Sequence, residues 1–205
     1  MLRLLFRSEA DLPAAAAAVR DAMSDHGVVA LPTETYYGLA VDPDDDVAVE
    51  RLFTLKRRPR DKALLVVGAS LEQLGRLVQI PDDWRERLES AWPAPLTVVL
   101  PTAAGSPAAG SGRTLAVRVP ASGLLRALLA VAGPITATSA NCSGGEALAS
   151  ADAVAEVLGH GLAVLLDGGT TPGGAPSTLV DLISSPPRVL RKGPWEPPAA
   201  WGVAS

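Results

Sequence analysis

The chain has 205 residues, 48% of them hydrophobic, which is enough for one compact domain with a sizeable core. Its formal net charge of -4 gives no general attraction for nucleic acid, so any basic site has to be local. A single cysteine excludes an internal disulfide and a cysteine-based zinc cluster, and two histidines are too few for a histidine-rich metal site. We expect neither a signal peptide nor a membrane span, and therefore a cytoplasmic enzyme or binding protein.

Helices and strands are predicted along the whole chain. Helices are indicated by runs of helix-forming residues, with Ser or Asp where they begin and Gly or Pro where they end. Strands are indicated by short apolar runs between turn residues. In chain order, the sequence predicts a helix over 11–26, strands over 28–32 and 36–41, a helix over 47–56, a strand over 63–67, helices over 70–78 and 81–92, strands over 96–100 and 115–119, a helix over 122–132, a strand over 135–139, a helix over 150–158, and strands over 162–166, 177–183 and 188–192.

This order of elements favours a mixed fold, because some strands follow one another directly and others are separated by a helix. We expect an α/β fold of the α+β type, in which helices flank a twisted sheet of parallel and antiparallel strands. One domain is expected over residues 1–194, with residues 195–205 as a loosely held C-terminal extension. The segment 102–113, rich in Gly, Ala, Ser and Pro, is expected to be a mobile surface loop.

Polar residues gather where the expected strands end, which is where ligands tend to bind in open sheets. Hydroxyls, a carboxamide and fixed cations at such places suit a polar, anionic small molecule. Neither a Walker-type nor a dinucleotide-type glycine loop is present, so a nucleotide would have to bind by another arrangement. The places are PTET (32–35), KRRPRDK (56–62), Arg118, TSANCSG (138–144), and APSTLVD (175–181) together with VLRKG (189–193).

Seven short motifs carry a resemblance to a known family. In chain order they are PTETYYGLA, KRRPRDK, WPAPLT, AVRVP, TSANCSG, PSTLVD and VLRKG, between residues 32 and 193. Together they resemble the short form of the YrdC/TsaC family of threonylcarbamoyl-AMP synthases. The resemblance implies a YrdC-like fold with a basic central cavity. It also implies condensation of L-threonine, bicarbonate and ATP to threonylcarbamoyl-AMP and pyrophosphate, with Mg²⁺ bound through the ATP phosphates rather than by the protein.

The same resemblance implies partners and residue roles. The product would pass to a tRNA threonylcarbamoyl transferase complex that modifies the adenosine beside the anticodon, and the chain itself would contact tRNA weakly. Four anionic groups would share the cavity, so fixed cations are needed there. Lys56 and Arg58 are the catalytic candidates and would hold the phosphates and the carboxylated amine. We therefore expect threonine and bicarbonate to bind at Thr33, Thr35, Arg118, Thr138 and Ser177, and ATP to bind at Lys56, Arg58, Lys62, Ser139, Asn141, Ser143 and Arg191. Lys62 departs from the family pattern, in which many members have Asn followed by Pro. Tyr36 and Leu65 are candidate walls of the threonine pocket.

Several of these residues also have a purely structural interpretation. The basic run 56–62 could be a solvated helix end, and Arg118 could face solvent on a half-exposed strand. The hydroxyl residues could be ordinary turn or cap residues. The acidic run 42–46 is interpreted as helix capping rather than a metal loop, because it lacks the glycine and distal Glu of a calcium loop. Cys142 is disfavoured as a nucleophile, since no histidine lies in a suitable context.

Two other functions compete with the synthase hypothesis. A noncatalytic RNA-binding or ribosome-assembly protein would also use a basic concave surface, but the acidic net charge counts against it. Steeply salt-dependent binding to double-stranded RNA would favour it. Carbamoyl transfer from carbamoyl phosphate on the same fold is the second alternative, and pyrophosphate release that depends on carbamoyl phosphate instead of bicarbonate would reveal it.

Overall fold

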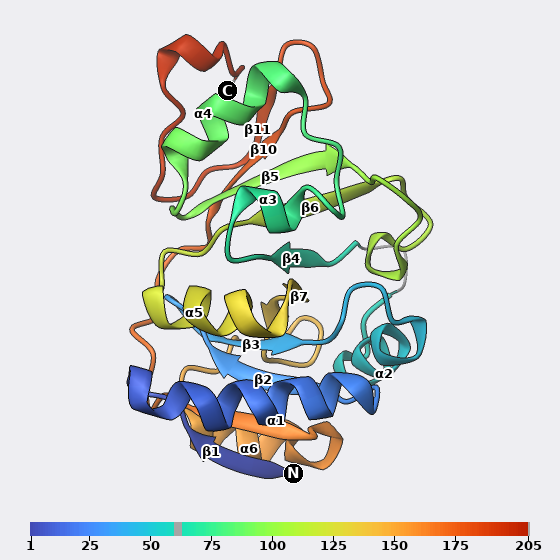
Figure 1. The fold of residues 1–205 in the computed structure, drawn as a ribbon, viewed down its shortest axis with the longest axis vertical. Coiled ribbons are helices and arrows are strands. Elements are labelled where there is room, and N and C mark those ends of the chain that lie inside the picture. Colours follow the sequence, from blue (N-terminus) through green and yellow to red (C-terminus); the bar gives the residue numbers. More distant parts are fainter. Residues whose placement is uncertain (60–62, 205) are drawn as a thin grey trace.

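The computed structural model describes residues 1–59 and 63–204 (Figure 1). Its strands form two mixed sheets, one of six strands and one of five, with helices beside both. The six-stranded sheet lies towards the end of the molecule that carries the C-terminus, and the five-stranded sheet lies towards the N-terminus. The predicted mixed α/β fold is confirmed, with the strands divided over two sheets.

The two sheets have the following strand orders and pairings. In the five-stranded sheet, β1, β9 and β2 pair in parallel, and β3 is antiparallel to both β2 and β8. In the six-stranded sheet, β10 is parallel to β5 and β4 is parallel to β6, whereas the other neighbours are antiparallel. The first sheet contains β1 Leu2–Leu5, β9 Val164–Asp167, β2 Val29–Pro32, β3 Tyr37–Ala40 and β8 Thr138–Ser139, and the second contains β11 Arg188–Arg191, β10 Thr178–Asp181, β5 Leu96–Pro101, β6 Thr114–Arg118, β4 Leu65–Val67 and β7 Ile135–Thr136.

Side-chain caps begin several helices at the places that the sequence indicates. The Asp45 carboxylate accepts hydrogen bonds from two backbone N–H groups of α2 at 3.0 and 3.1 Å, as expected for the acidic run. Ser70, Ser122 and Ser150 cap α3, α5 and α6 in the same way. No helix within 1–59 and 63–204 has the length and apolar character needed to cross a membrane. The helices are α1 Leu12–Ser24, α2 Asp46–Lys56, α3 Leu71–Leu74, α4 Asp82–Ala91, α5 Gly123–Ala132 and α6 Ala151–Leu158.

The hydrophobic core connects the two sheets. Buried side chains form two clusters, and each cluster draws residues from both sheets. In the first, Leu39 of the five-stranded sheet and Val98 of the six-stranded sheet belong to one cluster. In the second, α1 and α5 pack together over Leu31 and Val67, again one from each sheet. Burial of this shared apolar surface holds the sheets in a defined relative position, which any site between them requires.

Three expected elements differ in the structure. A strand that the sequence did not predict, β1, pairs in parallel with β9 at the N-terminal edge. The expected strand 135–139 is divided, because β7 pairs with β4 in one sheet and β8 pairs with β3 in the other. The helix expected over 70–78 ends at Leu74, because the backbone of Val78 bridges to Thr102 beyond the end of β5. In each case a long-range backbone pairing overrides the local preference.

Two segments expected to be loose are packed. Within 102–113, Ala108 and Ala109 are buried, and the Ala108 carbonyl accepts a hydrogen bond from the Leu64 N–H at 2.8 Å. In the C-terminal tail, Trp201 is 7% exposed and its ring centroid lies 5.1 Å from that of Trp84. Buried alanines and a tryptophan contact therefore anchor both segments to the core. Residues 103–105 and 110–113 are exposed, as expected for a surface loop, and its mobility stays a prediction.

Candidate active site

A cavity of about 570 Å³ lies between the two sheets and is lined by residues of both. The turn between β2 and β3, together with β8, forms its lining from the five-stranded sheet. Residues of β4, β5, β6, β10 and β11 line it from the six-stranded sheet. The sequence-predicted site residues that line this cavity are Thr33, Thr35, Arg58, Arg118, Thr138, Ser139, Ser177 and Arg191, and the two expected wall residues Tyr36 and Leu65 line it as well.

Arg118 is a buried cation at the end of β6. Its side chain is 11% exposed, which excludes the solvent-facing interpretation. Its Nη2 lies 3.2 Å from Oε2 of Glu34, whereas its Nε is buried without a hydrogen-bond partner among the described residues. Burial lowers the pKa of Arg118 and the Glu34 carboxylate opposes that change, but a guanidinium remains charged at any physiological pH. This half-satisfied cation is suited to bind an anion in the cavity.

Glu34 is a residue of the site that the sequence analysis did not single out. Its Oε2 pairs with Arg118, and its Oε1 accepts a hydrogen bond from the Ser122 N–H at 3.1 Å, at the beginning of α5. Glu34 therefore connects the β2–β3 turn of one sheet with β6 and α5 on the other side of the cavity. The only available sequence signal was its place between the two threonines of PTET.

The β2–β3 turn is itself held by its threonines. The Thr33 hydroxyl donates to the Tyr36 carbonyl at 2.7 Å and accepts from the Thr35 N–H at 3.2 Å. The Thr35 carbonyl accepts a hydrogen bond from the Gly173 N–H at 2.7 Å. Thr33 and Thr35 both line the cavity, so the turn stabilises itself with residues that also meet a ligand there.

A second guanidinium, that of Arg191, lines the cavity at the end of β11. Its Nε and Nη2 donate to the Ser177 carbonyl at 3.1 and 2.9 Å. Burial lowers the pKa of Arg191, and the nearby charge of Arg118 lowers it further, which means that two cations face the same space. The Ser177 hydroxyl also lies 2.7 Å from the hydroxyl of Thr97, a buried cavity residue that the sequence analysis missed.

Lys56 is not among the residues that line the cavity. It is 2% exposed, and its Nζ donates to the carbonyls of Ser139 and Asn141 and, at 3.0 Å, to the side-chain oxygen of Asn141. Burial lowers the pKa of Lys56 to about 8, with a further contribution from the charge of Arg58. The interpretation of Lys56 as a solvated helix end is excluded, because its ammonium group binds the segment that follows β8.

The remaining predicted site residues lie in different surroundings. Arg58 lines the cavity and donates from Nη2 to the Ala63 carbonyl at 3.1 Å. Asn141 and Ser143 do not line the cavity. Asn141 donates to the Gly145 carbonyl at 2.5 Å, and the Ser143 N–H donates to the Lys56 carbonyl at 2.7 Å. Lys62 lies outside the described residues.

A metal site would need several carboxylates, histidines or cysteines around one point. Within the part of the chain that the structure describes, no three such side chains gather around a common point. The acidic run before α2 is used locally: Asp45 caps the helix and its other oxygen lies 2.5 Å from Nδ1 of His26. This confirms helix capping as the role of Asp45.

Comparison with known proteins identifies the family. A sequence model described as "Telomere recombination" (Sua5_yciO_yrdC) matches residues 21–193. The chain belongs to the Sua5/YciO/YrdC family. It is 37% identical over 178 residues to a threonylcarbamoyl-AMP synthase of Vibrio vulnificus, covering 84% of this chain and 95% of that protein. It is 42% identical over 170 residues to a threonylcarbamoyl-AMP synthase of Pyrococcus abyssi, covering 81% of this chain. The chain spans about half the length of this archaeal relative, 50% by the alignment.

Solved structures of the family have the same fold. Pyrococcus abyssi Sua5 complexed with L-threonine superposes with a TM-score of 0.81 at 38% identity, covering 94% of this chain and 57% of that one. Escherichia coli YciO superposes with a TM-score of 0.78 and covers 95% of both chains, but at 22% identity it supports the fold alone. The alignment thus covers nearly the whole of YciO and little more than half of Pyrococcus abyssi Sua5.

Proposed function

We propose that this member of the Sua5/YciO/YrdC family is a threonylcarbamoyl-AMP synthase, a nucleotidyltransferase that uses ATP. It condenses L-threonine, bicarbonate and ATP to threonylcarbamoyl-AMP and pyrophosphate. The observation that carries the proposal is the cavity between the sheets, which is lined by arginines and by residues with hydroxyl groups. The chain that forms this cavity aligns with 95% of the length of a synthase from Vibrio vulnificus. The Pyrococcus abyssi relative was solved with L-threonine, which supports this amino acid as the substrate here.

Arg118 is proposed to bind the threonine carboxylate. Its Nε is buried and has no partner among the described residues, although a buried N–H donor is costly to leave without an acceptor. A carboxylate in the cavity would satisfy it, while Glu34 keeps hold of Nη2 on the other side. The hydroxyls of Thr33, Thr35, Thr138 and Ser177 then lie along the cavity wall for the amino and hydroxyl groups of threonine and for bicarbonate.

Arg58 and Arg191 are proposed to bind the phosphates and the nucleotide, with Ser139 beside them on the cavity wall. A guanidinium binds phosphate oxygens through two parallel hydrogen bonds, which fixes both position and charge. Mg²⁺ would enter on the ATP phosphates and neutralise charge as pyrophosphate departs. Lys56 at the end of α2 supports this region together with Asn141 and Ser143 of the segment after β8. Lys62 is proposed to contact ATP from its place in the basic motif KRRPRDK alone.

The chemistry requires alignment more than a protein nucleophile. The threonine ammonium group first loses a proton to solvent, and the neutral nitrogen then forms a bond with the bicarbonate carbon as water is lost. An oxygen of the resulting carbamate then forms a bond with the α-phosphorus, and the bond from that phosphorus to pyrophosphate breaks. Each reactant carries at least one anionic group, so the residues of the cavity hold mutually repelling groups together and stabilise the charge that moves to the leaving group. These reaction steps do not require a covalent bond between a substrate and any side chain of the protein.

The product is proposed to serve tRNA modification. A threonylcarbamoyl transfer complex in the cytoplasm would move the group from threonylcarbamoyl-AMP to the adenosine beside the anticodon. A weak contact with tRNA is the one nucleic-acid interaction that we propose for this chain, because its net charge of -4 gives no general attraction.

Pyrophosphate release tests the proposal directly. Purified protein is incubated with ATP and Mg²⁺, and L-threonine or bicarbonate is omitted in turn. We expect release only when both are present, together with a threonine-containing adenylate by mass spectrometry. Release with carbamoyl phosphate in place of bicarbonate would instead support carbamoyl transfer. Absence of release from folded protein, with tight and salt-dependent binding to double-stranded RNA, would support the RNA-binding alternative.

A further inference from the structure

A glycine-rich segment, GGTTPGGAP (168–176), joins the two sheets and ends at the cavity. It leaves β9 of the five-stranded sheet and leads through Ser177 into β10 of the six-stranded sheet. At the C-terminal end of the segment, Gly174, Pro176 and the following residue Ser177 line the cavity. Three of its glycines have positive φ: 77° at Gly169, 72° at Gly173 and 120° at Gly174. Since glycine gives the backbone unusual freedom, this wall of the cavity needs an external anchor to hold one conformation.

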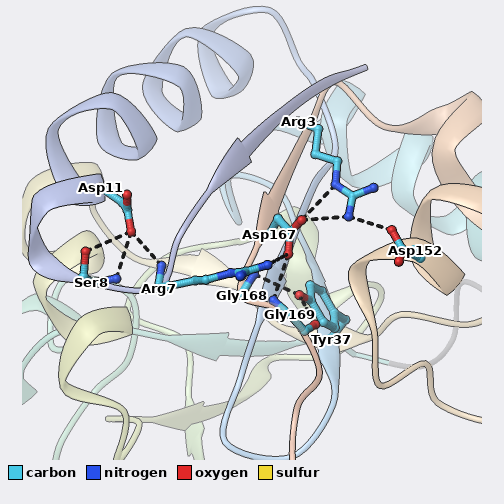
Figure 2. A network of polar contacts seen from close by, with 9 residues as sticks. All are labelled: Arg3, Arg7, Ser8, Asp11, Tyr37, Asp152, Asp167, Gly168 and Gly169. Carbon is cyan, nitrogen blue, oxygen red and sulfur yellow. Dashed lines mark hydrogen bonds and ion pairs between the residues drawn. The ribbon is translucent and has the colours of Figure 1, made fainter.

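The anchor at the beginning of the segment is a nearly buried carboxylate, that of Asp167, with a side chain that is 9% exposed (Figure 2). Its Oδ2 accepts two hydrogen bonds from Arg3, at 3.0 and 2.7 Å. Its Oδ1 accepts from Nη2 of Arg7 at 3.2 Å and from the N–H of Gly169 at 2.8 Å. The carboxylate therefore connects the N-terminal strand and the residues just after it to the first turn of the glycine-rich segment.

Tyr37 holds the same turn from the other side. Its hydroxyl accepts a hydrogen bond from the Gly168 N–H at 3.0 Å and donates to the Gly169 carbonyl at 2.8 Å (Figure 2). Asp11 adds a further connection, because its carboxylate accepts a hydrogen bond from the Arg7 N–H at 2.9 Å and so fixes the backbone from which the Arg7 side chain extends. The backbone of Gly168 and Gly169 is thus held by Tyr37, which is distant in the sequence, and by Asp167, whose own partners Arg3 and Arg7 are also distant.

The segment transmits this position to the cavity. Farther along it, the Thr171 N–H donates to the Ala149 carbonyl at 2.7 Å, and the Gly173 N–H donates to the Thr35 carbonyl at 2.7 Å. At its end, Ser177 binds Thr97 through its hydroxyl and Arg191 through its carbonyl. A shift of the segment would therefore move the turn that carries Thr35 and the partner that orients Arg191.

We propose that Asp167 is a positioning residue for this cavity: together with Arg3, Arg7 and Tyr37 it fixes the glycine-rich segment and thereby the wall that carries Ser177. Asp167 does not itself line the cavity. Although burial raises the pKa of Asp167, the hydrogen bonds from Gly169, Arg3 and Arg7 outweigh it and keep the carboxyl below its ordinary pKa. The anchor is therefore ionised at neutral pH. The assignment of substrates to this wall rests on the proposed function, whereas the anchoring does not.

The test compares Asp167→Asn with Asp152→Asn in the full chain. Both oxygens of the Asp167 carboxylate accept hydrogen bonds, from Arg3 on one side and from Arg7 and Gly169 on the other. The NH₂ group of an asparagine at this position can only donate, so in either orientation it would face a donor and lose those hydrogen bonds. Asp152 is the matched control, because its side chain is 86% exposed and contacts Arg3 without contacting the segment. Hydrogen exchange of peptides that cover 168–176 is measured by mass spectrometry, and KM and kcat are measured by pyrophosphate release.

For Asp167→Asn we expect faster exchange in 168–176 and KM values for L-threonine and ATP that rise about tenfold, with kcat changed by less than about threefold. Asp152→Asn should match the wild type in both measurements. If Asp167→Asn does not fold, Arg7→Gln removes a single contact to the same carboxylate and should give a smaller change in the same direction.

Unchanged exchange in 168–176 for a folded variant would overturn the anchoring. Faster exchange with unchanged KM values would overturn the link from the anchor to the cavity. If the wild-type protein releases no pyrophosphate, the proposed function fails, but hydrogen exchange still decides whether Asp167 holds the segment.

Discussion

Two parts of the molecule carry a buried cation, and they use their charge differently. At the end of α2, Lys56 is 2% exposed and its ammonium group has three oxygen acceptors in residues 139–141. At the end of β6, Arg118 is also buried, but its Nε has no partner among the described residues and the side chain lines the cavity. An ammonium group has three donors, so Lys56 is saturated by the protein, whereas Arg118 retains a donor for a ligand. Basic motifs locate charge in a sequence, but they do not tell which donors the fold has already used.

The comparison predicts that the largest loss of activity comes from Arg118. Replacing it by Met keeps the volume and removes the charge, so we expect kcat/KM for L-threonine to fall by about 2–4 kcal/mol of transition-state stabilisation. Steady-state pyrophosphate release measures this loss. A value of kcat/KM within about threefold of the wild type would remove Arg118 from the site.

A control separates binding from folding in this variant. Arg118→Met leaves the Glu34 carboxylate without its cation, which lowers stability for a reason unrelated to substrate. The double variant Glu34→Gln with Arg118→Met removes that unpaired charge. We expect it to regain stability against urea but not activity, since the guanidinium that binds the carboxylate is still missing.

For Lys56 the comparison predicts a loss of stability. Lys56→Met keeps the aliphatic stem but removes the ammonium donor from the carbonyls of Ser139 and Asn141, whereas the Asn141 side-chain oxygen keeps its hydrogen bond from the Ser139 hydroxyl. We therefore expect the free energy of unfolding to fall by about 1–3 kcal/mol. Urea unfolding measures the change. Activity should fall as well, because Ser139 lines the cavity and is held by this contact.

Arg58→Ala is the matched comparison for Lys56, since Arg58 lies two residues later and lines the cavity. We expect Arg58→Ala to lose about 2–4 kcal/mol of transition-state stabilisation with a smaller change in stability than Lys56→Met. The distinction between the two cations would be wrong if Lys56→Met unfolded at the wild-type urea concentration while losing the same activity as Arg58→Ala. Lys56 would then act on the substrate directly.

The pH dependence of stability sharpens the same distinction. Burial, assisted by the charge of Arg58, lowers the pKa of Lys56 to about 8 in the folded protein, whereas an unfolded lysine titrates near about 10.4. Between these values the unfolded chain binds more protons, so the free energy of unfolding should rise with pH. The slope approaches about 1.4 kcal/mol per pH unit for one group. Urea unfolding from pH 7.5 to 9.5 should show this rise in the wild type relative to Lys56→Met, and parallel curves would contradict it.

The parts of the fold that the sequence predicted are those that depend on neighbouring residues. Helices begin at Asp45, Ser122 and Ser150, because a short polar side chain can cap the backbone N–H groups that follow it. The strand β1 was missed because its partner, β9, lies more than 150 residues away and its own leucines at positions 2 and 5 are exposed. The C-terminal tail was misjudged for the same reason, since Trp201 finds Trp84 only in the folded protein.

The same distinction between local and long-range contacts applies to the candidate site. The motifs predicted at strand ends contain residues that line one cavity, because these strand ends converge between the two sheets. Glu34 and Thr97 were missed, since their partners Arg118 and Ser177 are 84 and 80 residues away. The positions of Lys56, Asn141 and Ser143 outside the cavity lining could not be predicted either, because motif spacing does not show which way a side chain is turned once its backbone is fixed.

Ser143 gives the smallest predicted effect and tests how far the site extends beyond the cavity. Its side chain is exposed, and its backbone N–H binds the Lys56 carbonyl at 2.7 Å. Ser143→Ala keeps that backbone bond, so any loss reports the hydroxyl alone. We expect ATP to bind more weakly by about 0.5–1.5 kcal/mol, with L-threonine binding changed less. Calorimetric titration of each ligand measures this difference. Equal binding constants before and after the substitution would restrict the nucleotide site to residues that line the cavity, and the segment after β8 would then act only through Lys56.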